Sequence, residues 1–197
     1  MRIGIFGAGG MAEALGGRWS GHEVMVAARD RAKAEKISAR VGTWAETARA
    51  SEVILLAVPA PSATEVVAAA GESLAGKILI DCTNAVGPGA VLTIPDQAER
   101  IAAAAPDAHV VKAFNLCHVD VWRMTPPVFG GRPLAVPLCG PPEAVEVVSS
   151  LVRDLGCTPL NAGGLDRARL MEATMAFTVG LWFGGHDAQA CFPPLPA

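Results

Sequence analysis

The chain has 197 residues, a length that fits one domain and excludes the two-domain dehydrogenase plan with an equally large substrate domain. Hydrophobic residues make up 51% and charged residues 18%, so the chain can bury enough apolar surface to fold and is not disordered. Sixteen basic residues against 19 acidic ones give a net charge of −3, which provides no field to gather nucleic acid or an anionic membrane. We expect neither as a partner.

The uncharged stretch near the carboxyl end, residues 173–185, is shorter than the roughly 20 residues of a membrane span, and the first residues show no signal-peptide layout. We therefore expect a cytoplasmic protein. The chain has no tyrosine, which excludes a phenol as general acid. The cysteines form no C-x-x-C pair and have no metal-ligand spacing with histidines, so we expect plain thiols and no metal at Cys82, Cys117, Cys139, Cys157 and Cys191.

The first half of the chain alternates apolar runs with segments of helical spacing. The pattern predicts a strand over 2–6, a helix over 11–19, a strand over 23–27 and a helix over 31–40. A weak strand near 41–44 and a short helix over 46–50 follow. Residues 53–58 are an uninterrupted apolar run stopped by Pro59, which is typical of a strand buried on both faces of a parallel sheet.

The alternation continues to the end of the chain. The remaining predicted segments are helices over 62–74, 96–104, 142–155 and 165–182, and strands over 77–81, 109–113, 134–138 and 158–161. We predict an α/β protein of Rossmann type, with a doubly wound, mainly parallel sheet and a C-terminal helix. Residues 1–165 would form one Rossmann-type domain, and residues 166–197 a helix and a Pro-rich tail packed on it or on a partner subunit.

The most informative motif is Gly7-x-Gly9-x-x-Ala12, between the first strand and the first helix. Glycines at this bend let a diphosphate approach bare backbone at the positive end of the helix. The same pattern also occurs in glycine-rich turns that bind nothing. A strand before it, a helix after it and further strand-helix units favour dinucleotide binding.

The end of the second strand indicates which dinucleotide binds. An NAD enzyme needs an Asp or Glu there to accept from the ribose hydroxyls, and this chain has Ala27 and Ala28. Arg29 follows, with Arg31 and Lys33 beyond, so cations stand where a 2′-phosphate would lie. The pattern favours NADP(H) and disfavours FAD. Alternatively, the basic residues only form the solvated start of a helix. Asp30 is the acid that would favour NAD.

Taken together, the segments resemble the NADPH-dependent deazaflavin (coenzyme F-420) reductase family and related predicted dinucleotide-binding oxidoreductases. The NADPH-binding reductase domain of six-transmembrane metalloreductases is also similar. The likeness spans nearly the whole chain. It rests on the Gly7 turn, Ala28-Arg29, Ala57-Val58-Pro59, Asp81-Cys82-Thr83-Asn84, Val110-Val111-Lys112-Ala113-Phe114-Asn115, Cys139-Gly140, Asn161-Ala162-Gly163-Gly164-Leu165 and Ala168-Arg169-Leu170.

The resemblance implies a role for each matching position. The pyrophosphate would lie on Gly7, Ala8, Gly9, Gly10 and Met11. The 2′-phosphate would lie at Ala28, Arg29 and Lys33, although Ala28 stands where the family tends to have a hydroxyl. Ala57, Val58 and Pro59 would line the adenosine-ribose side, and Asn84 would lie near the nicotinamide ribose.

Hydride transfer to a second ring needs stacked faces and exclusion of water, so a catalytic side chain is not required and none is assigned. Phe114, Met171, Met175, Phe177, Trp182 and Phe183 are available to line an apolar slot for a planar acceptor, or equally to form a core face or a dimer seam. A carbonyl or imine acceptor would require a proton donor, for which His118 is the candidate. Lys112 ends a strand beside the expected site, where it could also be a surface cation.

Three functional hypotheses remain open. The first is an NADPH-dependent reductase of a small-molecule hydride acceptor such as a deazaflavin or flavin. The second is an imine or carbonyl reductase like pyrroline-5-carboxylate reductase, which is weakened because few residues remain for a dimerising helical domain. The third is a non-catalytic NADP-binding module that senses redox state. The apolar residues 176–183 further suggest burial against a second copy, so we expect a homodimer.

Overall fold

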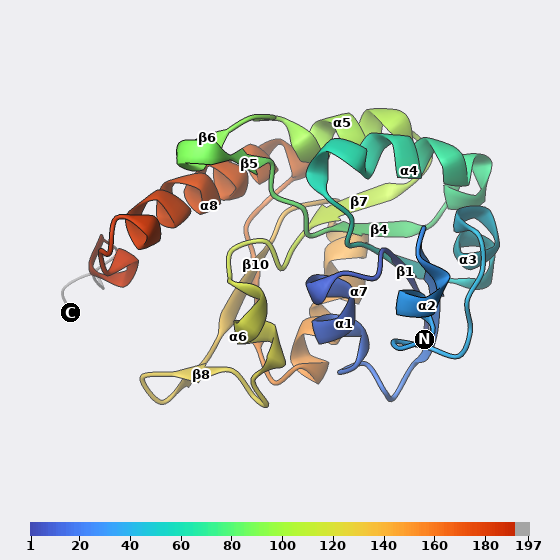
Figure 1. Ribbon diagram of the computed structural model, residues 1–197, viewed down its shortest axis with the longest axis horizontal. Coiled ribbons are helices and arrows are strands. Elements are labelled where there is room, and N and C mark those ends of the chain that lie inside the picture. Colours follow the sequence, from blue (N-terminus) through green and yellow to red (C-terminus); the bar gives the residue numbers. More distant parts are fainter. Residues whose placement is uncertain (192–197) are drawn as a thin grey trace.

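The computed structural model describes residues 1–191, and the Pro-rich tail predicted at the end of the chain lies outside the described residues. Its centre is a five-stranded parallel sheet in the order β2-β1-β3-β4-β7 (Figure 1). The predicted mainly parallel sheet of Rossmann type is confirmed. The strands of this sheet are β1 (Arg2–Phe6), β2 (Glu23–Ala27), β3 (Val53–Leu56), β4 (Ile78–Asp81) and β7 (His109–Lys112).

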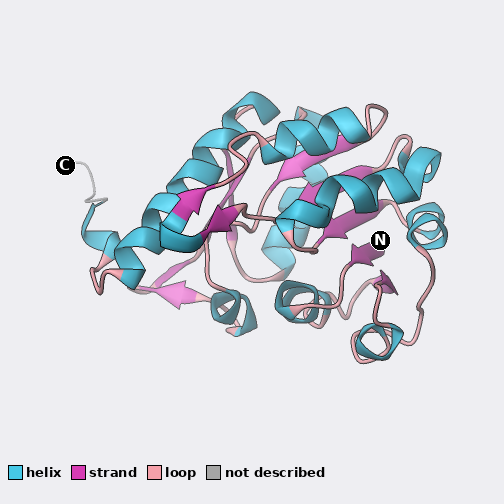
Figure 2. Ribbon diagram, turned by 45° about the horizontal axis from the view of Figure 1, so that its top comes forward, coloured by secondary structure: helices cyan, strands magenta, loops and turns pink. Residues whose placement is uncertain are grey.

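Successive side chains of each strand enter two different cores, because side chains alternate across a sheet. In β3, Val53 and Leu55 join one core, while Ile54 and Leu56 join the other. Helices therefore cover both faces of the sheet, as Figure 2 shows. The first core is covered by α1 (Gly10–Gly16) and α7 (Pro142–Asp154), and the second by α3 (Trp44–Ala50), α4 (Ala63–Ala70) and α5 (Gln97–Ala104).

The second helix is shorter than predicted. It begins at Asp30, whose carboxylate accepts from the Lys33 amide, and α2 covers only Arg31–Ala34. The chain then returns to the edge of the sheet: the Ser38 hydroxyl donates to Val24, and the Arg40 carbonyl accepts from the Val26 amide. These contacts replace the expected helix over 35–40, because pairing with β2 competes with helical hydrogen bonds for the same backbone groups.

Several short elements were not predicted from the sequence. The strands β5 (Val86–Gly87) and β6 (Val91–Leu92) form one hairpin around a 3-10 turn, η3 (Pro88–Ala90), and β8 (Val128–Phe129) and β9 (Arg132–Pro133) form another. The short helix α6 (Val119–Arg123) precedes the second hairpin in the chain and packs on α1. The predicted strands over 134–138 and 158–161 are present as β10 (Ala135–Leu138) and β11 (Thr158–Asn161), and they form a separate parallel pair joined by α7.

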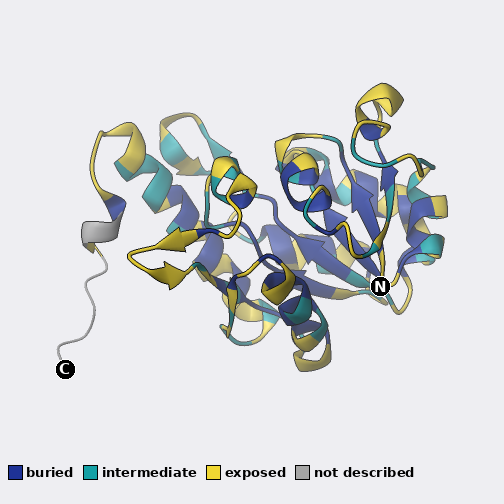
Figure 3. Cartoon of the chain, turned by 90° about the horizontal axis from the view of Figure 1, so that it is seen from below, coloured by how far each residue is buried: buried dark blue, intermediate teal, exposed yellow. Residues whose placement is uncertain are grey.

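The predicted C-terminal helix is α8 (Ala168–Phe183). Its first half packs on α5, and its later turns lie along β6 and η3 and extend away from the sheet (Figure 1). Figure 3 colours the far end of α8, residues 177–183, as intermediate or exposed. Among the described residues, no helix is long and apolar enough to span a membrane. The remaining short turns are η1 (Ala60–Ser62), η2 (Gly71–Leu74), η4 (Leu165–Arg167) and η5 (Ala188–Cys191).

Candidate functional site

The glycine turn has two glycines with different tasks. Gly7 has φ +119°, and a Cβ atom there would lie 2.1 Å from the carbonyl oxygen of Ala57, so a side chain is excluded by both conformation and space. Gly9 has an ordinary negative φ, and a Cβ there would meet nothing within 4 Å. Gly7 therefore lets the turn approach β3, whereas Gly9 leaves the outer side of the turn bare.

The other predicted site residues follow neighbouring strands. Ala28 and Arg29 follow β2, residues 57–59 follow β3, and Asn84 lies just beyond β4. Because parallel strands end at one edge of the sheet, these segments lie at the same edge as the glycine turn, beside the point where the strand order reverses at β1 and β3. The structure thus brings together segments that are far apart in the sequence.

An open cleft of about 550 Å³ lies at the end of β2. Its lining includes the backbone bend at Ala28, the Arg29 side chain and the indole of Trp44, which is held edge-on against Phe6 with ring centroids 5.2 Å apart. Arg29 is exposed and makes no hydrogen bond or ion pair with any residue that the structure describes. The cleft also contains Glu46, whose carboxylate accepts from the Thr43 amide and hydroxyl. It therefore offers an aromatic wall and a guanidinium without an ion-pair partner, which suit a base and a phosphate.

Lys33 lies differently from Arg29. It is not part of the cleft lining, and its ammonium is 3.8 Å from the Asp30 carboxylate on the same turn. Arg31 does line the cleft, but its guanidinium donates to Glu35. Of the three basic residues that the sequence singled out, Arg29 is thus the one whose charge is free for a ligand.

Asn84 is paired with Asn115, which follows β7. The Asn84 Nδ2 donates to the backbone carbonyl of Asn115 at 2.7 Å, and the Asn115 Nδ2 donates to the Asn84 Oδ1 at 3.0 Å. Asn84 is half-buried and Asn115 is buried. The loop after β4 and the loop after β7 are therefore joined by reciprocal hydrogen bonds at the edge of the sheet.

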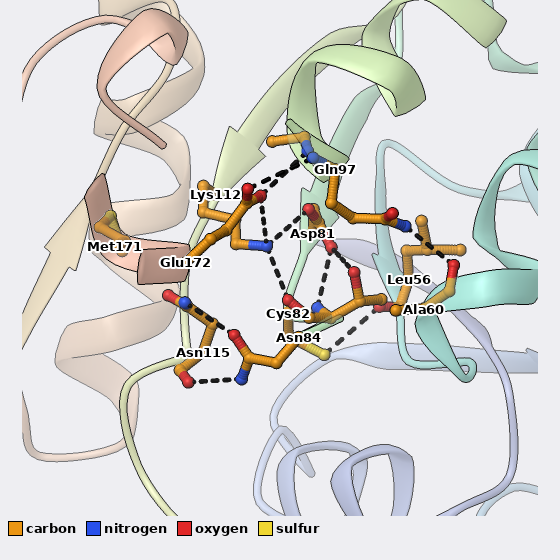
Figure 4. Close-up of polar contacts among 12 residues, drawn as sticks. Leu56, Ala60, Asp81, Cys82, Asn84, Gln97, Lys112, Asn115, Met171 and Glu172 are labelled. Atoms are coloured by element: carbon orange, nitrogen blue, oxygen red, sulfur yellow. Dashed lines mark hydrogen bonds and ion pairs between the residues drawn. The ribbon is translucent and has the colours of Figure 1, made fainter. Parts of the chain in front are cut away.

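A cluster of buried charges lies beside this pair (Figure 4). The Lys112 ammonium donates to Asp81 at 2.9 Å and to the Thr83 carbonyl at 2.6 Å, and it lies 3.1 Å from Glu172. The three charged side chains are 0% exposed. Glu172 also accepts from the amides of Gln97 and Ala98, the first residues of α5. The cluster therefore ties α8 to the sheet and to the backbone beside Asn84.

Burial and charge set the protonation of this cluster. Burial by itself lowers the pKa of Lys112, but the facing carboxylates of Asp81 and Glu172 outweigh it, and the pKa is raised overall. Burial raises the pKa of Glu172, and the neighbouring Lys112 charge opposes that rise only in part. Lys112 is therefore charged at neutral pH and compensates the acids around it.

We expect Lys112→Met to destabilise the fold by about 3–5 kcal/mol, because it leaves buried carboxylates without a counter-charge. Urea denaturation measures this as a fall in the free energy of unfolding. Adding Asp81→Asn and Glu172→Gln to the same chain should recover most of the loss, since the acids are then neutral. A triple variant as unstable as the single one would contradict the ionic role of the cluster.

The candidate apolar slot residues divide into two groups. Phe114, Met171 and Met175 are buried, and the first two line a cavity of about 10 Å³, which is large enough for about one water molecule and too small for a planar ring. Phe177, Trp182 and Phe183, on the outer end of α8, are 55%, 42% and 86% exposed. Only this second group is accessible to an acceptor or a partner.

The remaining candidates have ordinary roles. The His118 side chain is 65% exposed, lies 3.2 Å from Asp120 and accepts from its amide at the start of α6. The five cysteines are free; four are buried or half-buried, and Cys191 is exposed. No group of three metal-ligating side chains occurs among residues 1–191.

Sequence reasoning missed Glu172 and the pairing of Asn115. Glu172 had a detectable signal, because it is the sole acid in the apolar segment that became α8. Asn115 stood in a motif block of the resemblance but was given no role. Its partner Asn84 is 31 positions away, and nothing local indicates the contact.

The parallel sheet, the glycine turn after β1 and the loops at its edge together define a Rossmann-type dinucleotide-binding fold. Residues 2–85 match a family model described as NADP oxidoreductase, coenzyme F420-dependent. The chain is 34% identical over 179 residues to metalloreductase STEAP3 of Rattus norvegicus, covering 87% of this chain and 36% of that protein. It is 28% identical to the F420-dependent NADP reductase of Methanocaldococcus jannaschii, covering 69% of this chain and 64% of that one.

Two solved structures have a similar fold. A proposed F420-dependent NADP-reductase from Arthrobacter sp. FB24 has a TM-score of 0.82 and 25% identity, covering 93% of this chain and 95% of that one. A reductive aminase from Aspergillus terreus, solved with NADPH, has a TM-score of 0.71 and 23% identity, covering 93% of this chain and 62% of that one, and shares the fold. The family model, the archaeal relative and the Arthrobacter structure are each described as NADP oxidoreductases or reductases, and the resemblance found in the sequence motifs is confirmed.

Proposed function

We propose that this protein is an NADPH-dependent oxidoreductase that transfers a hydride between NADP(H) and a planar acceptor such as a deazaflavin or flavin. The observation that carries the proposal is the free guanidinium of Arg29 in the cleft at the end of β2, beside a glycine turn and with no acid at Ala28. A 2′-phosphate is the part of NADPH that such a cation recognises and NADH lacks.

The proposed cofactor would lie along the edge of the sheet. Gly7, Ala8, Gly9, Gly10 and Met11 would hold the pyrophosphate, since the turn presents backbone with an open outer side at Gly9. At one end, Arg29 and Ala28 would receive the 2′-phosphate in the cleft. We expect Lys33 to bind the 2′-phosphate more weakly than Arg29 does, because its ammonium lies 3.8 Å from the Asp30 carboxylate.

The middle and far end of the cofactor would meet the other loops. Ala57, Val58 and Pro59 follow β3 and would border the ribose on the adenosine side. Asn84 would lie by the nicotinamide ribose, where its amide is held by Asn115. When bound, NADPH supplies the hydride, and the task of the chain is to orient the nicotinamide and exclude water from one face of it.

A planar acceptor agrees better with this chain than a carbonyl or imine. A carbonyl or imine needs a protein proton donor, and the candidate His118 is exposed and engaged with Asp120. Transfer between two rings needs stacked faces and exclusion of water, and it needs no proton donor from the protein. The likeness to the F420-dependent family model supports the same acceptor class.

The test is NADPH oxidation followed at its absorbance band with a panel of deazaflavin, flavin, quinone and imine acceptors. We expect turnover with the deazaflavin or flavin and none with the imine. Turnover with the imine alone would replace the proposed acceptor by the second hypothesis. Tight NADPH binding without turnover on any acceptor would indicate a non-catalytic NADP-binding module.

We further propose a homodimer in which the outer face of α8 is buried. Leu170 and Phe177 are 52% and 55% exposed on a helix that carries no charge after Glu172, and an apolar face of this kind is costly to leave in water. Sedimentation velocity over a range of concentrations should give a dimer for the unaltered chain and more monomer for Phe177→Glu. A monomer at every concentration would refute the dimer.

A further inference from the structure

We propose that Asn115 is a positioning residue for the nicotinamide end of the cofactor, acting through Asn84 on a ribose hydroxyl. The inference rests on the proposed function, because it assumes that Asn84 touches NADP(H). It adds a residue that holds Asn84 in one orientation, and it predicts which half of the cofactor that residue affects.

The first step is the orientation of the two amides. A backbone carbonyl can only accept, so the contact at 2.7 Å to the Asn115 carbonyl must be made by the Nδ2 of Asn84. The Asn84 Oδ1 is then fixed on the side of the Asn115 side chain, which must present its own Nδ2 at 3.0 Å. The pair therefore has one consistent arrangement: turning over the Asn84 amide would lose both hydrogen bonds, and turning over the Asn115 amide would lose the one to the Asn84 Oδ1.

The second step is what remains for a ligand. One N–H of the Asn84 amide and one lone pair of its Oδ1 are left after the contacts with Asn115. A ribose hydroxyl, which both donates and accepts, can pair with this N–H and this lone pair. Asn84 is half-buried and so still accessible, whereas Asn115 is 1% exposed and cannot itself reach a ligand without a rearrangement.

The third step is the backbone that brings Asn115 to this place. Phe114 has φ +63°, a left-handed conformation that costs a residue with a side chain free energy. Its ring is buried edge-on between Trp19 and Trp122, at centroid distances of 6.0 and 5.3 Å. The aromatic packing holds the strained bend, and the bend directs Asn115 back towards the loop after β4.

The neighbouring contacts hold Asn84 from the other side. Lys112 binds the carbonyl of Thr83, and Asp81 accepts from the Thr83 amide and hydroxyl, so the residue before Asn84 is immobilised by buried groups (Figure 4). Asn84 is thus restrained through its backbone by the charge cluster and through its side chain by Asn115. A contact preorganised in this way loses little entropy when a ligand binds.

The test uses Asn115→Asp, which keeps the shape and replaces the donor by an acceptor. A carboxylate at this position faces the Asn84 Oδ1, and Asn84 cannot turn because its Nδ2 is held by the Asn115 carbonyl. By calorimetry on the full chain, we expect NADP⁺ to bind about tenfold more weakly or worse. Adenosine 2′,5′-bisphosphate, which lacks the nicotinamide half, should bind as tightly as to the unaltered protein.

The matched control is Asn161→Asp, the same change at an exposed asparagine whose Oδ1 already accepts from the Gly163 amide, which a carboxylate can also do. It should leave both ligands unaffected. Failure of the unaltered chain to bind the bisphosphate would refute the proposed function. Normal binding of both ligands to Asn115→Asp, or equal losses of the two, would overturn the role of Asn115 alone.

A double-mutant cycle separates positioning from a general structural role. Asn115→Ala should weaken NADP⁺ binding in the unaltered chain and have no further effect in the Asn84→Ala background, because it acts only through Asn84. Additive losses would contradict the proposal. Melting temperatures check that each variant is folded, and failure of both Asn115 variants to fold would show that Asn115 serves folding and would overturn its role in binding.

Discussion

Arg29→Ala should weaken NADPH binding by about 10- to 100-fold and leave NADH binding within about twofold, because charge-assisted hydrogen bonds to a phosphate contribute about 1.5–3 kcal/mol. The effect is large because Arg29 lines the cleft and makes no hydrogen bond or ion pair with any described residue. Titration of the unaltered chain and the variant with both nucleotides measures it.

Lys33→Ala is the matched control for Arg29→Ala. It also removes one cation from the start of α2, but its charge is shared with Asp30 and it does not line the cleft. We expect the loss of NADPH affinity to be several-fold smaller than for Arg29→Ala. Equal losses of NADPH and NADH in Arg29→Ala would refute the assignment of the 2′-phosphate to this cleft.

Gly7→Ala and Gly9→Ala should fail in different ways. At Gly7 a methyl group would lie 2.1 Å from the Ala57 carbonyl oxygen at φ +119°, so we expect a loss of about 3–5 kcal/mol in the free energy of unfolding. At Gly9 the added methyl meets no protein atom within 4 Å, so stability should change by less than about 1 kcal/mol. A bound diphosphate would occupy that space, so NADPH affinity should fall at least tenfold.

Urea denaturation and nucleotide titration of the two variants test this contrast. Each variant serves as the control of the other, because the substitution is identical and the positions are two residues apart. Unimpaired NADPH binding to Gly9→Ala would place the diphosphate elsewhere. A stable Gly7→Ala would show that the turn can move away from β3.

The sheet and the glycine turn were predictable because their signals are local. A run such as Val53–Leu56 is buried on both faces in the structure, as its uninterrupted apolar sequence indicates. The Gly7 turn was recognised from its place between a strand and a helix. The end of α2 was not predicted, because it depends on hydrogen bonds from residues 38–42 to β2.

The candidate site was predictable only in part. Arg29 and Lys33 look equivalent in the sequence, and the cap formed by Asp30 distinguishes them in the structure. Lys112 could equally have been a surface cation. Its burial follows from Asp81 and Glu172, which reach it from another strand and from α8, and no local pattern encodes contacts over such separations.

The sequence by itself determined that the chain folds, that strands and helices alternate, and that a bare turn followed by basic residues lies near the amino end. These properties depend on composition and on spacing over a few residues, which act before distant segments meet. Only the tertiary structure decided which cation stays free, which methionines and aromatic residues are buried, and that Asn115 holds Asn84. Those outcomes depend on which groups contact each side chain in the folded chain, and spacing over a few residues does not specify them.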